Sequence, residues 1–313
     1  MPQMTPAQVR LVDPILSDIA HGFRNPDISR VGRVLFPRVP IPVRGAQIIR
    51  FGKESFRLYN TRRAPGSNTK RVQYGYSAGP VSLTQEALEG VVADELREEA
   101  TQVPGVDLAR GAVELVQDVF DRAEEYEQAR IALDAGQYGV NHKVALSGTD
   151  QWTDGASNPG AQIREYGEAI RAATGRRPNR LVLRPADFNA LAEHPLLKDR
   201  FKYTSADSLT VDMLARFFNV RQVVVGDDVY MADADADAAP FRDIWTASVL
   251  AFVPEGAQYN VPSYGYTYHL PGHPLVKQPY YENNVSSWVY PMLYERQVVQ
   301  TGMGAGFLIQ NAS

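Results

Sequence analysis

The longest regular pattern in this chain of 313 residues is helical and runs from Asp107 to Ala135. Apolar side chains recur there at steps of three and four residues, the spacing that gathers them on one face of a helix. This series consists of Leu108, Ala112, Leu115, Val119, Ala123, Tyr126 and Leu133. Asp107 suits the start of such a helix and Gly136 suits its end. At 1.5 Å per residue the helix is about 40 Å long, so we expect it to form the spine of a domain.

Two segments before this helix cannot fold alone. Residues 1–43 contain seven prolines, which predict an extended arm with room only for a short helix around Ala7–Ile19. Residues 47–59 and 71–76 are rich in β-branched and aromatic side chains and flank the turn-forming Ala64–Asn68, which predicts a long β-ribbon. Because a two-stranded ribbon is marginally stable in water, we expect it to lie along its own domain or along a neighbouring chain.

The chain after the helix changes character at residues 138–160, which are polar and turn-rich. This stretch is too long for an ordinary connector, so we place a domain boundary there. Helices and strands then alternate as in a layered α/β unit: helices at 162–174, 187–191 and 209–218, strands at 180–183, 222–225 and 244–253. In the tail, 277–312, short aromatic and β-branched runs predict antiparallel strands that rejoin an earlier sheet.

The composition excludes several classes of protein. The absence of cysteine excludes disulfides, thiolate metal sites and a cysteine nucleophile, and it indicates a reducing compartment. A formal net charge of -4 argues against a dedicated DNA-binding protein, which needs clustered Lys and Arg. No apolar stretch reaches the roughly 18 to 20 residues that span a bilayer, and the N-terminus lacks the pattern of a signal peptide. We therefore expect a soluble protein that does not bind membranes.

One motif suggests catalysis. Gly75–Gly79 matches the G-x-S-x-G pattern in which Ser77 would be the nucleophile of a serine hydrolase. Such a nucleophile needs a buried strand before it and a helix directly after it, whereas here Arg71–Tyr74 alternates with polar residues and Pro80 follows at once. A turn between the ribbon and a sheet fits this context better, and we predict no catalytic residue; the hydrolase stays as the alternative from another functional class.

Patterns for metals and cofactors are incomplete. His269 and His273 are separated by Pro271 and Gly272, so no helix holds both rings on one face, and a third ligand is missing. The alternating aspartates from Asp233 lack the glycine and glutamate that complete a calcium loop. The sequence therefore predicts no metal site and no cofactor.

The distribution of charge is more informative. The segment from Arg44 to Arg71 contains eight basic residues and one acidic residue, Glu54. The basic residues are Arg44, Arg50, Lys53, Arg57, Arg62, Arg63, Lys70 and Arg71. The segment from Glu86 to Asp134 has the opposite balance, with fourteen acidic and four basic residues. We expect each basic ribbon to lie on the acidic face of the next copy of the chain, with the alternative that both charged faces are merely solvated. The predicted acidic face consists of Glu95, Glu98, Glu99, Glu114, Asp118, Asp121, Glu124 and Glu125.

The order of these segments resembles the major capsid proteins of tailed bacteriophages, which have the Hong Kong ninety-seven fold. The resemblance covers nearly the whole chain and rests on several stretches that occur together in order: LSGTDQWTDGASNPGAQI, TGRRPNRLVL, RPADFNALAEHPLLKDRFKYT, LTVDMLARFFNVRQVVVGD, IWTASVLAFVP, PSYGYTY and GFLIQNA. It implies an α+β fold with an N-terminal arm (1–43), an extended β-ribbon loop (44–80), a peripheral domain with the long spine helix (81–150 and 275–313) and an axial α/β domain (151–274).

The resemblance also implies a function. Hexamers and pentamers of the chain would form an icosahedral capsid around double-stranded DNA, as part of a virion assembled in the host cytoplasm, with no reaction catalysed. Portal, scaffolding and decoration proteins would be further partners. In that family the extended loop lies on the peripheral domain of a neighbouring subunit. An encapsulin-type nanocompartment shell, which shares the fold, is the nearest alternative.

Overall fold

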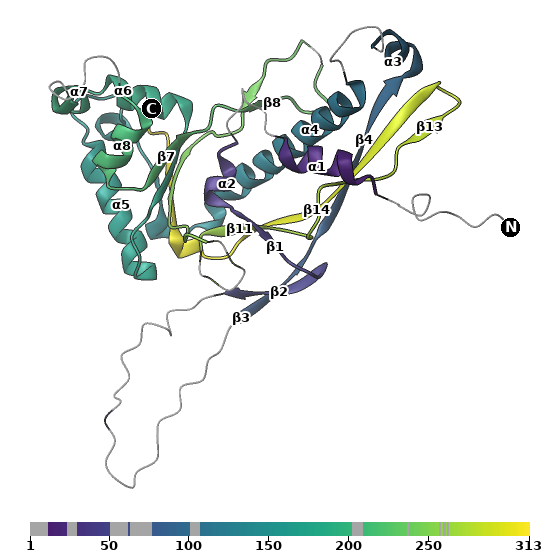
Figure 1. Ribbon diagram of the computed structural model, residues 1–313. Coiled ribbons are helices and arrows are strands. Elements are labelled where there is room, and N and C mark those ends of the chain that lie inside the picture. The colour runs from purple at the N-terminus through teal and green to yellow at the C-terminus, as the bar shows by residue number, and fades with distance from the viewer. Residues whose placement is uncertain are drawn as a thin grey trace.

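The computed structural model describes residues 12–23, 30–50, 62, 77–100, 107–201, 209–236, 238–256, 258, 261 and 263–313. Two sheets organise the fold, a six-stranded sheet beside a long helix and a five-stranded sheet with shorter helices along one side (Figure 1). No helix in the described part of the chain combines the length and apolar character that crossing a bilayer requires.

The six-stranded sheet is built around β14 (Ser287–Gln300), the longest strand. The strands of this sheet besides β14 are β1 (Arg38–Pro40), β4 (Thr84–Ala93), β11 (Gly265–His269), β12 (Leu275–Val276) and β13 (Tyr280–Glu282). Strands β4, β11, β12 and β13 all pair with β14 in antiparallel register, and β1 pairs with β11 in parallel. The prediction that the tail rejoins an earlier sheet is therefore confirmed for β14, which pairs with β4 from Ser287↔Ala93 to Arg296↔Thr84.

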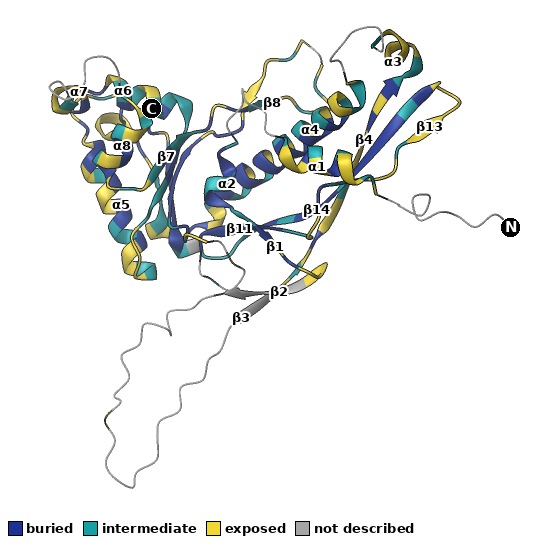
Figure 2. Cartoon of the chain, in the orientation of Figure 1, coloured by how far each residue is buried: buried dark blue, intermediate teal, exposed yellow. Residues whose placement is uncertain are grey.

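Helix α4 (Leu108–Ala132) packs against this sheet and is the predicted spine. Its N-cap is Asp107, whose carboxylate accepts a hydrogen bond from the backbone N–H of Arg110 at 3.1 Å. On its buried face, Val113, Val116 and Phe120 pack in one cluster with side chains of β14 (Figure 2).

The predicted face of this helix is wrong. Leu115 is 67% exposed and Val119 and Tyr126 are 40% exposed. Five polar side chains, Gln117, Asp121, Glu124, Glu125 and Gln128, are buried instead. The apolar spacing misled because Asp121, Glu124 and Glu125 bind groups of the arm and Gln128 donates to Thr267 of β11, which offsets the cost of burying them.

The five-stranded sheet has the order β5-β15-β10-β6-β7. Its strands are β5 (Lys143–Ala145), β6 (Arg180–Leu183), β7 (Gln222–Val225), β10 (Ser248–Ala251) and β15 (Gly306–Gln310). Its helices are α5 (Pro159–Thr174), α6 (Pro185–Glu193), α7 (Pro195–Phe201) and α8 (Val211–Phe218). Asn158 caps the start of α5, and Gly175, at φ 70°, ends it in the left-handed conformation that glycine adopts without strain. The predicted layered α/β unit is confirmed here, with β6 and β7 at the predicted residues.

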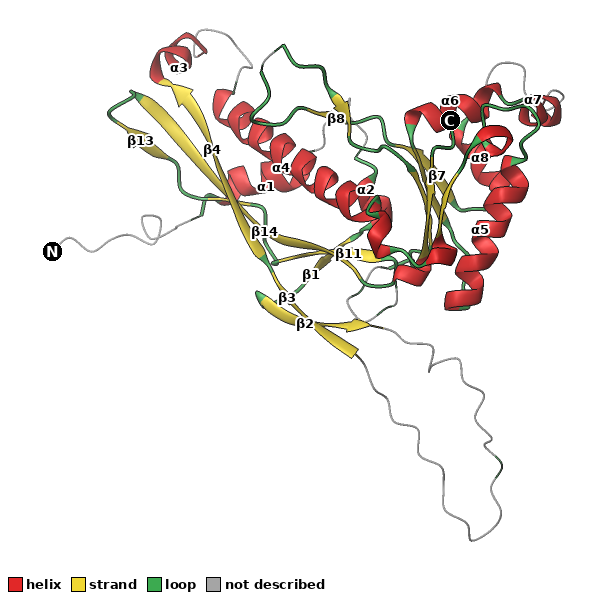
Figure 3. Ribbon diagram, turned by 180° about the vertical axis from the view of Figure 1, so that it is seen from behind, coloured by secondary structure: helices red, strands yellow, loops and turns green. Residues whose placement is uncertain are grey.

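The remaining elements are small and connect or flank the two sheets. They are α1 (Pro14–Gly22), α2 (Gly32–Leu35), α3 (Asp94–Ala100), the ribbon β2 (Gly45–Arg50) with β3 (Ser77–Ser82), the hairpin β8 (Val229–Tyr230) with β9 (Arg242–Asp243), and, within the part of the chain that the structure describes, four short 3-10 turns. Seen from behind, α3 lies beyond the end of β4 at one extremity, and β2–β3 lies at the edge of the body (Figure 3). The arm helix begins at Pro14, later than predicted, and residues 1–11 lie outside the described residues.

The membership of the sheets does not follow the predicted domain boundaries. Strands β5 and β15, assigned from the sequence to the peripheral unit, belong to the five-stranded sheet, and β11, assigned to the axial unit, belongs to the six-stranded sheet. The reason is packing, because Phe307 and Ile309 of β15 are buried in the core that contains Ile170 and Leu181. The four-part domain division stays a prediction.

Replacing Val116 by proline is expected to prevent folding of the subunit. Val116 is 3% exposed in the middle of α4, and proline there removes a backbone hydrogen bond and clashes with the preceding turn at a cost of about 3 kcal/mol or more. Circular dichroism and solubility of Val116→Pro check this, with Leu115→Ala, at an exposed position of the same helix, as the control. An unchanged melting temperature for Val116→Pro would contradict the role of α4 as the spine.

Candidate assembly surfaces

Three acidic residues of α4, Asp118, Asp121 and Glu124, pair with arginines of the chain's own arm. Arg30 binds Asp118 at 2.9 Å and also pairs with Asp228. Further along the arm, Arg33 pairs with Asp121, and Arg38 pairs with both Asp121 and Glu124. The arginines thus follow the helix in order, and their charges compensate carboxylates that would be costly to bury alone.

Glu125 holds the backbone of the arm. Its carboxylate accepts hydrogen bonds from the N–H groups of Val31 at 3.1 Å and Gly32 at 2.9 Å, and from Nε1 of Trp245 at 2.6 Å. A Cβ atom at Gly32 would lie 2.1 Å from Oε1 of Gln128, so a larger residue there would force the Gln128 side chain to move. Burial raises the pKa of Glu125, although the hydrogen bonds from Trp245 and Gly32 oppose the shift.

A fourth arginine reaches the helix from the sheet. Arg296 on β14 is 2% exposed and binds Glu127 at 2.5 Å and Glu86 at 2.8 Å. The helix therefore receives arginines from the arm on one part of its surface and from β14 on another. Both sets belong to the same subunit.

These contacts correct the predicted acidic face. Asp121, Glu124 and Glu125 are buried, at 4%, 1% and 1% exposure, and are not available to a neighbouring ribbon. Asp118 is half-buried against Arg30, and Glu114 pairs with Arg110 at 2.7 Å. Three members of the predicted face are exposed, and all lie on α3: Glu95, Glu98 and Glu99.

The predicted basic ribbon is described only at its base. Arg44 is 71% exposed and binds Glu295 of its own subunit at 2.6 Å. Arg50 ends β2, where its backbone pairs with Ser77, and Arg62 is exposed. The remaining members lie outside the described residues: Lys53, Arg57, Arg63, Lys70 and Arg71.

Sequence reasoning missed Arg30, Arg33, Arg38 and Arg296 as partners of the helix. A usable signal was present, because Gln117, Asp121, Glu124 and Gln128 recur at steps of three and four residues. That spacing places the four side chains on one face of the helix. A row of polar side chains on one face is compatible with binding to another part of the protein as well as with exposure to solvent.

The Glu124 carboxylate makes stability depend on pH. Burial opposes its charge, but the nearby guanidinium of Arg38, with those of Arg33 and Arg296, outweighs burial and lowers the pKa of Glu124 from 4.5 to about 2. A lowered pKa in the folded state stabilises the fold above the unfolded pKa, and this contribution is lost as pH falls. We expect the stability advantage of the native chain over Glu124→Gln to shrink progressively below pH 4.5, measured by urea unfolding at a series of pH values. An advantage independent of pH would contradict this assignment.

The catalytic motif has the wrong geometry. Ser77 begins β3, and the chain continues as a strand to Ser82 instead of entering a helix. This contradicts the nucleophile elbow that G-x-S-x-G would require.

The two histidines that could suggest a metal site have other surroundings. Nδ1 of His273 lies 3.2 Å from the backbone nitrogen of Glu295 and accepts its hydrogen bond. Among the described residues no group of three His, Cys, Asp or Glu is placed to hold a metal ion.

Comparison with known proteins identifies the family. The family model described as phage major capsid protein E matches residues 135–283. The major capsid protein of Burkholderia phage BcepMu is 34% identical over 276 residues, covering 86% of this chain and 87% of that protein. The crystal structure of a phage-related protein from Bordetella bronchiseptica is 42% identical, with a TM-score of 0.81 and coverage of 97% and 98% of the two chains.

A more distant structure has the same fold. The putative capsid protein of a prophage of E. coli CFT073 has a TM-score of 0.57 at 9% identity and covers 95% of this chain and 97% of its own. The predicted α+β capsid fold is thereby confirmed. Because the similarity to the Burkholderia phage protein extends over most of both chains, this chain belongs to the phage major capsid protein family.

Proposed function

We propose that copies of this chain assemble into hexamers and pentamers that close into an icosahedral shell around double-stranded DNA. One observation beyond family membership supports this most directly. Strands β2 and β3 pair only with each other among the described strands, and they lead into residues 51–76 at the Arg50↔Ser77 end. A two-stranded ribbon is marginal in water, and a contact with a neighbouring subunit would stabilise it.

The acidic corner at α3 is our proposed receiving surface for this ribbon. Glu95, Glu98 and Glu99 are exposed there, close in sequence to the exposed Leu96. Exposed ion pairs contribute about 0.2 to 1 kcal/mol each and are screened by salt, so charge would set the register of neighbours more than their affinity. The proposed neighbour contact therefore combines these charged side chains with the exposed apolar side chain of Leu96.

The slight negative charge of the chain suits a container for DNA. A strongly positive inner wall would bind the packaged phosphates and resist their movement. Portal, scaffolding and decoration proteins, and assembly in the host cytoplasm, belong to the same proposal by analogy with the family. An encapsulin-type compartment would use the same fold, and the similarity to a phage major capsid protein favours the virion.

Electron microscopy of the purified protein tests this function, combined with analysis of the particle contents. Closed shells that protect DNA from nuclease in a phage preparation are the expected result. Shells that contain a cargo enzyme and no DNA would show that the protein forms a nanocompartment and not a virion. Protein that forms no particles at any salt concentration would contradict both.

A non-enzymatic role is also part of the proposal. We expect a fluorophosphonate reagent specific for activated serines to leave the protein unlabelled, with Ser77→Ala as the matched control. Stoichiometric labelling of the native chain that disappears in Ser77→Ala would establish a serine nucleophile instead.

A further inference from the structure

The loop of the hairpin β8–β9 has an exposed apolar tip, which consists of Ala238, Pro240 and Phe241. Phe241 is 71% exposed, and Ala238 and Pro240 beside it are also exposed. Around this tip Asp233 and Asp243 are exposed and have no partner among the described residues, whereas Asp235 pairs with Arg242 at 3.1 Å. A single exposed apolar side chain is ordinary on a protein surface, so Phe241 indicates a contact only if a complementary cavity can receive it.

A cavity elsewhere in the subunit has the complementary character. It has a volume of about 350 Å³ and lies between α5 and the turn that connects α8 to β7. Ile163, Gly167, Pro178, Phe218 and Val220 give it apolar walls. An aromatic side chain that enters such a site buries about 150 to 250 Å² of surface.

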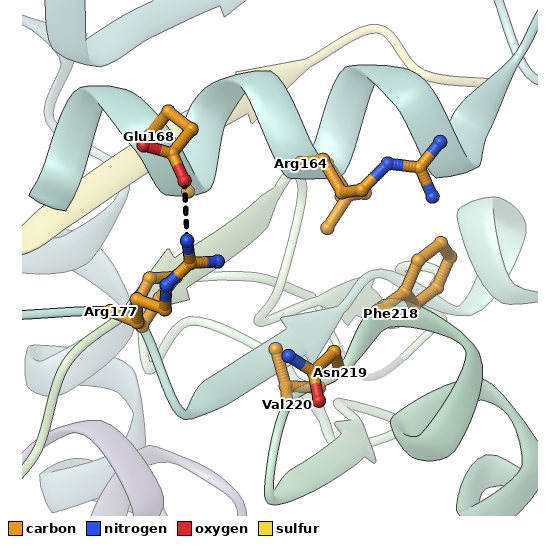
Figure 4. A pocket seen from close by; sticks show the side chains of 9 residues that line it. Arg164, Glu168, Arg177, Phe218, Asn219 and Val220 are labelled. Atoms are coloured by element: carbon orange, nitrogen blue, oxygen red, sulfur yellow. Dashed lines mark ion pairs between the residues drawn. The ribbon is translucent and has the colours of Figure 1, made fainter.

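The rim of this cavity is basic. Figure 4 shows Arg164 beside Phe218 on one side, and the pair of Arg177 and Glu168, at 2.9 Å, on the other. Glu168 also accepts from Arg171 at 2.5 Å, so two arginines share one carboxylate. Arg164 has no partner among the described residues, which leaves positive charge at the rim.

One subunit does not bring the tip to its own cavity. The strands of the hairpin are fixed to the spine and the arm, because the ring of Tyr230 lies 4.6 Å from that of Tyr126 on α4 and Asp228, just before β8, pairs with Arg30. The cavity is walled by α5 and α8, beside the five-stranded sheet, and both views of the fold place β8 apart from α5 (Figures 1 and 3). A knob and a hole on different parts of one chain form a heterologous contact, which closes into a ring when the rotation between copies permits.

We propose that Phe241 of one subunit enters the cavity at Arg164 and Phe218 of the next subunit in the ring. A second apolar cavity, lined by Phe188, Val211 and Val225, is disfavoured because Asp227 lies at its surface and would repel the acidic hairpin. The proposal rests on the proposed assembly into rings, since only a neighbouring copy can supply the tip.

Site-directed cross-linking tests the contact, because the natural chain contains no cysteine. Pro240→Cys combined with Val220→Cys keeps Phe241 and places one thiol at the tip and one at the cavity. Treatment of assembled particles with a short bismaleimide is expected to give a ladder of covalent multimers on a denaturing gel. The control pairs Pro240→Cys with Val211→Cys at the second cavity and is expected to stay monomeric.

Outcomes of this experiment separate the contact from the assembly itself. Normal particles that give no ladder, or an equal ladder from the control, would overturn the contact while leaving the shell intact. Absence of particles from the unsubstituted protein would contradict the proposed function instead.

A substitution series decides the question if the cysteine variants do not assemble. Phe241→Ala is expected to raise the subunit concentration needed for assembly by about tenfold or more, the effect of losing one buried aromatic contact. Arg164→Asp should also weaken assembly, and the exchanged pair Arg164→Asp with Asp243→Arg should restore it. Unchanged assembly of Phe241→Ala, with the melting temperature of the subunit also unchanged, would overturn the proposal.

Discussion

Replacing Glu124 by alanine is expected to lower the free energy of unfolding by about 3 to 5 kcal/mol, the cost of breaking a buried ion pair by removing one partner. Glu124 is 1% exposed and is the shared partner of Arg33 and Arg38. Without it, Asp121 is the one carboxylate of the described residues that still pairs with these guanidinium groups. Urea unfolding followed by tryptophan fluorescence measures the change.

Glu114→Ala is the matched control for this prediction. Glu114 lies on the same helix and pairs with Arg110, whose side chain is 60% exposed, so its loss should cost at most about 1 kcal/mol. Equal effects of the two substitutions would show that the charged contacts between arm and spine do not stabilise the subunit.

Reversing the charge of the ribbon is expected to have the largest effect on assembly. Replacing Arg57, Arg62 and Arg63 together by glutamate changes the charge of the ribbon by six units, and like charges at an interface misdirect the encounter of subunits. We expect no regular particles, as measured by sedimentation and electron microscopy, while circular dichroism shows a folded subunit.

The corresponding triple lysine variant is the control, since it keeps the charge and changes only the shape of the side chains. It should assemble, with a dependence on salt similar to that of the native chain. Normal particles from the glutamate variant would show that the charge of the ribbon is incidental.

The local pattern of apolar and polar residues predicted where many helices and strands lie in the sequence. It did not predict which side of the long helix α4 is buried. Strands β6 and β7 lie at the predicted residues, because short apolar runs between turns leave little choice. Strand β4, TQEALEGVVA, was not predicted as a strand, since its two glutamates, Glu86 and Glu89, and Gly90 hide the alternation that its pairing with β14 imposes.

The candidate site depended more heavily on tertiary structure. Spacing alone does not distinguish a solvated carboxylate from one bound to an arginine far away in the chain. Glu124 and Arg38 are 86 residues apart, and only the folded arm brings them together. The three acidic residues of α3, whose exposure follows from a short helix at the end of β4, are the part of the predicted face that still fits the proposed contact.

A cryo-electron microscopy reconstruction of assembled protein is the most direct test of the central claim that this chain forms a shell by binding its own copies. The predicted result is a closed icosahedral particle in which residues 51–76 of each subunit lie over a neighbouring subunit, near Glu95, Glu98 and Glu99. A monomer under every salt and crowding condition, with these residues folded against their own subunit, would contradict it.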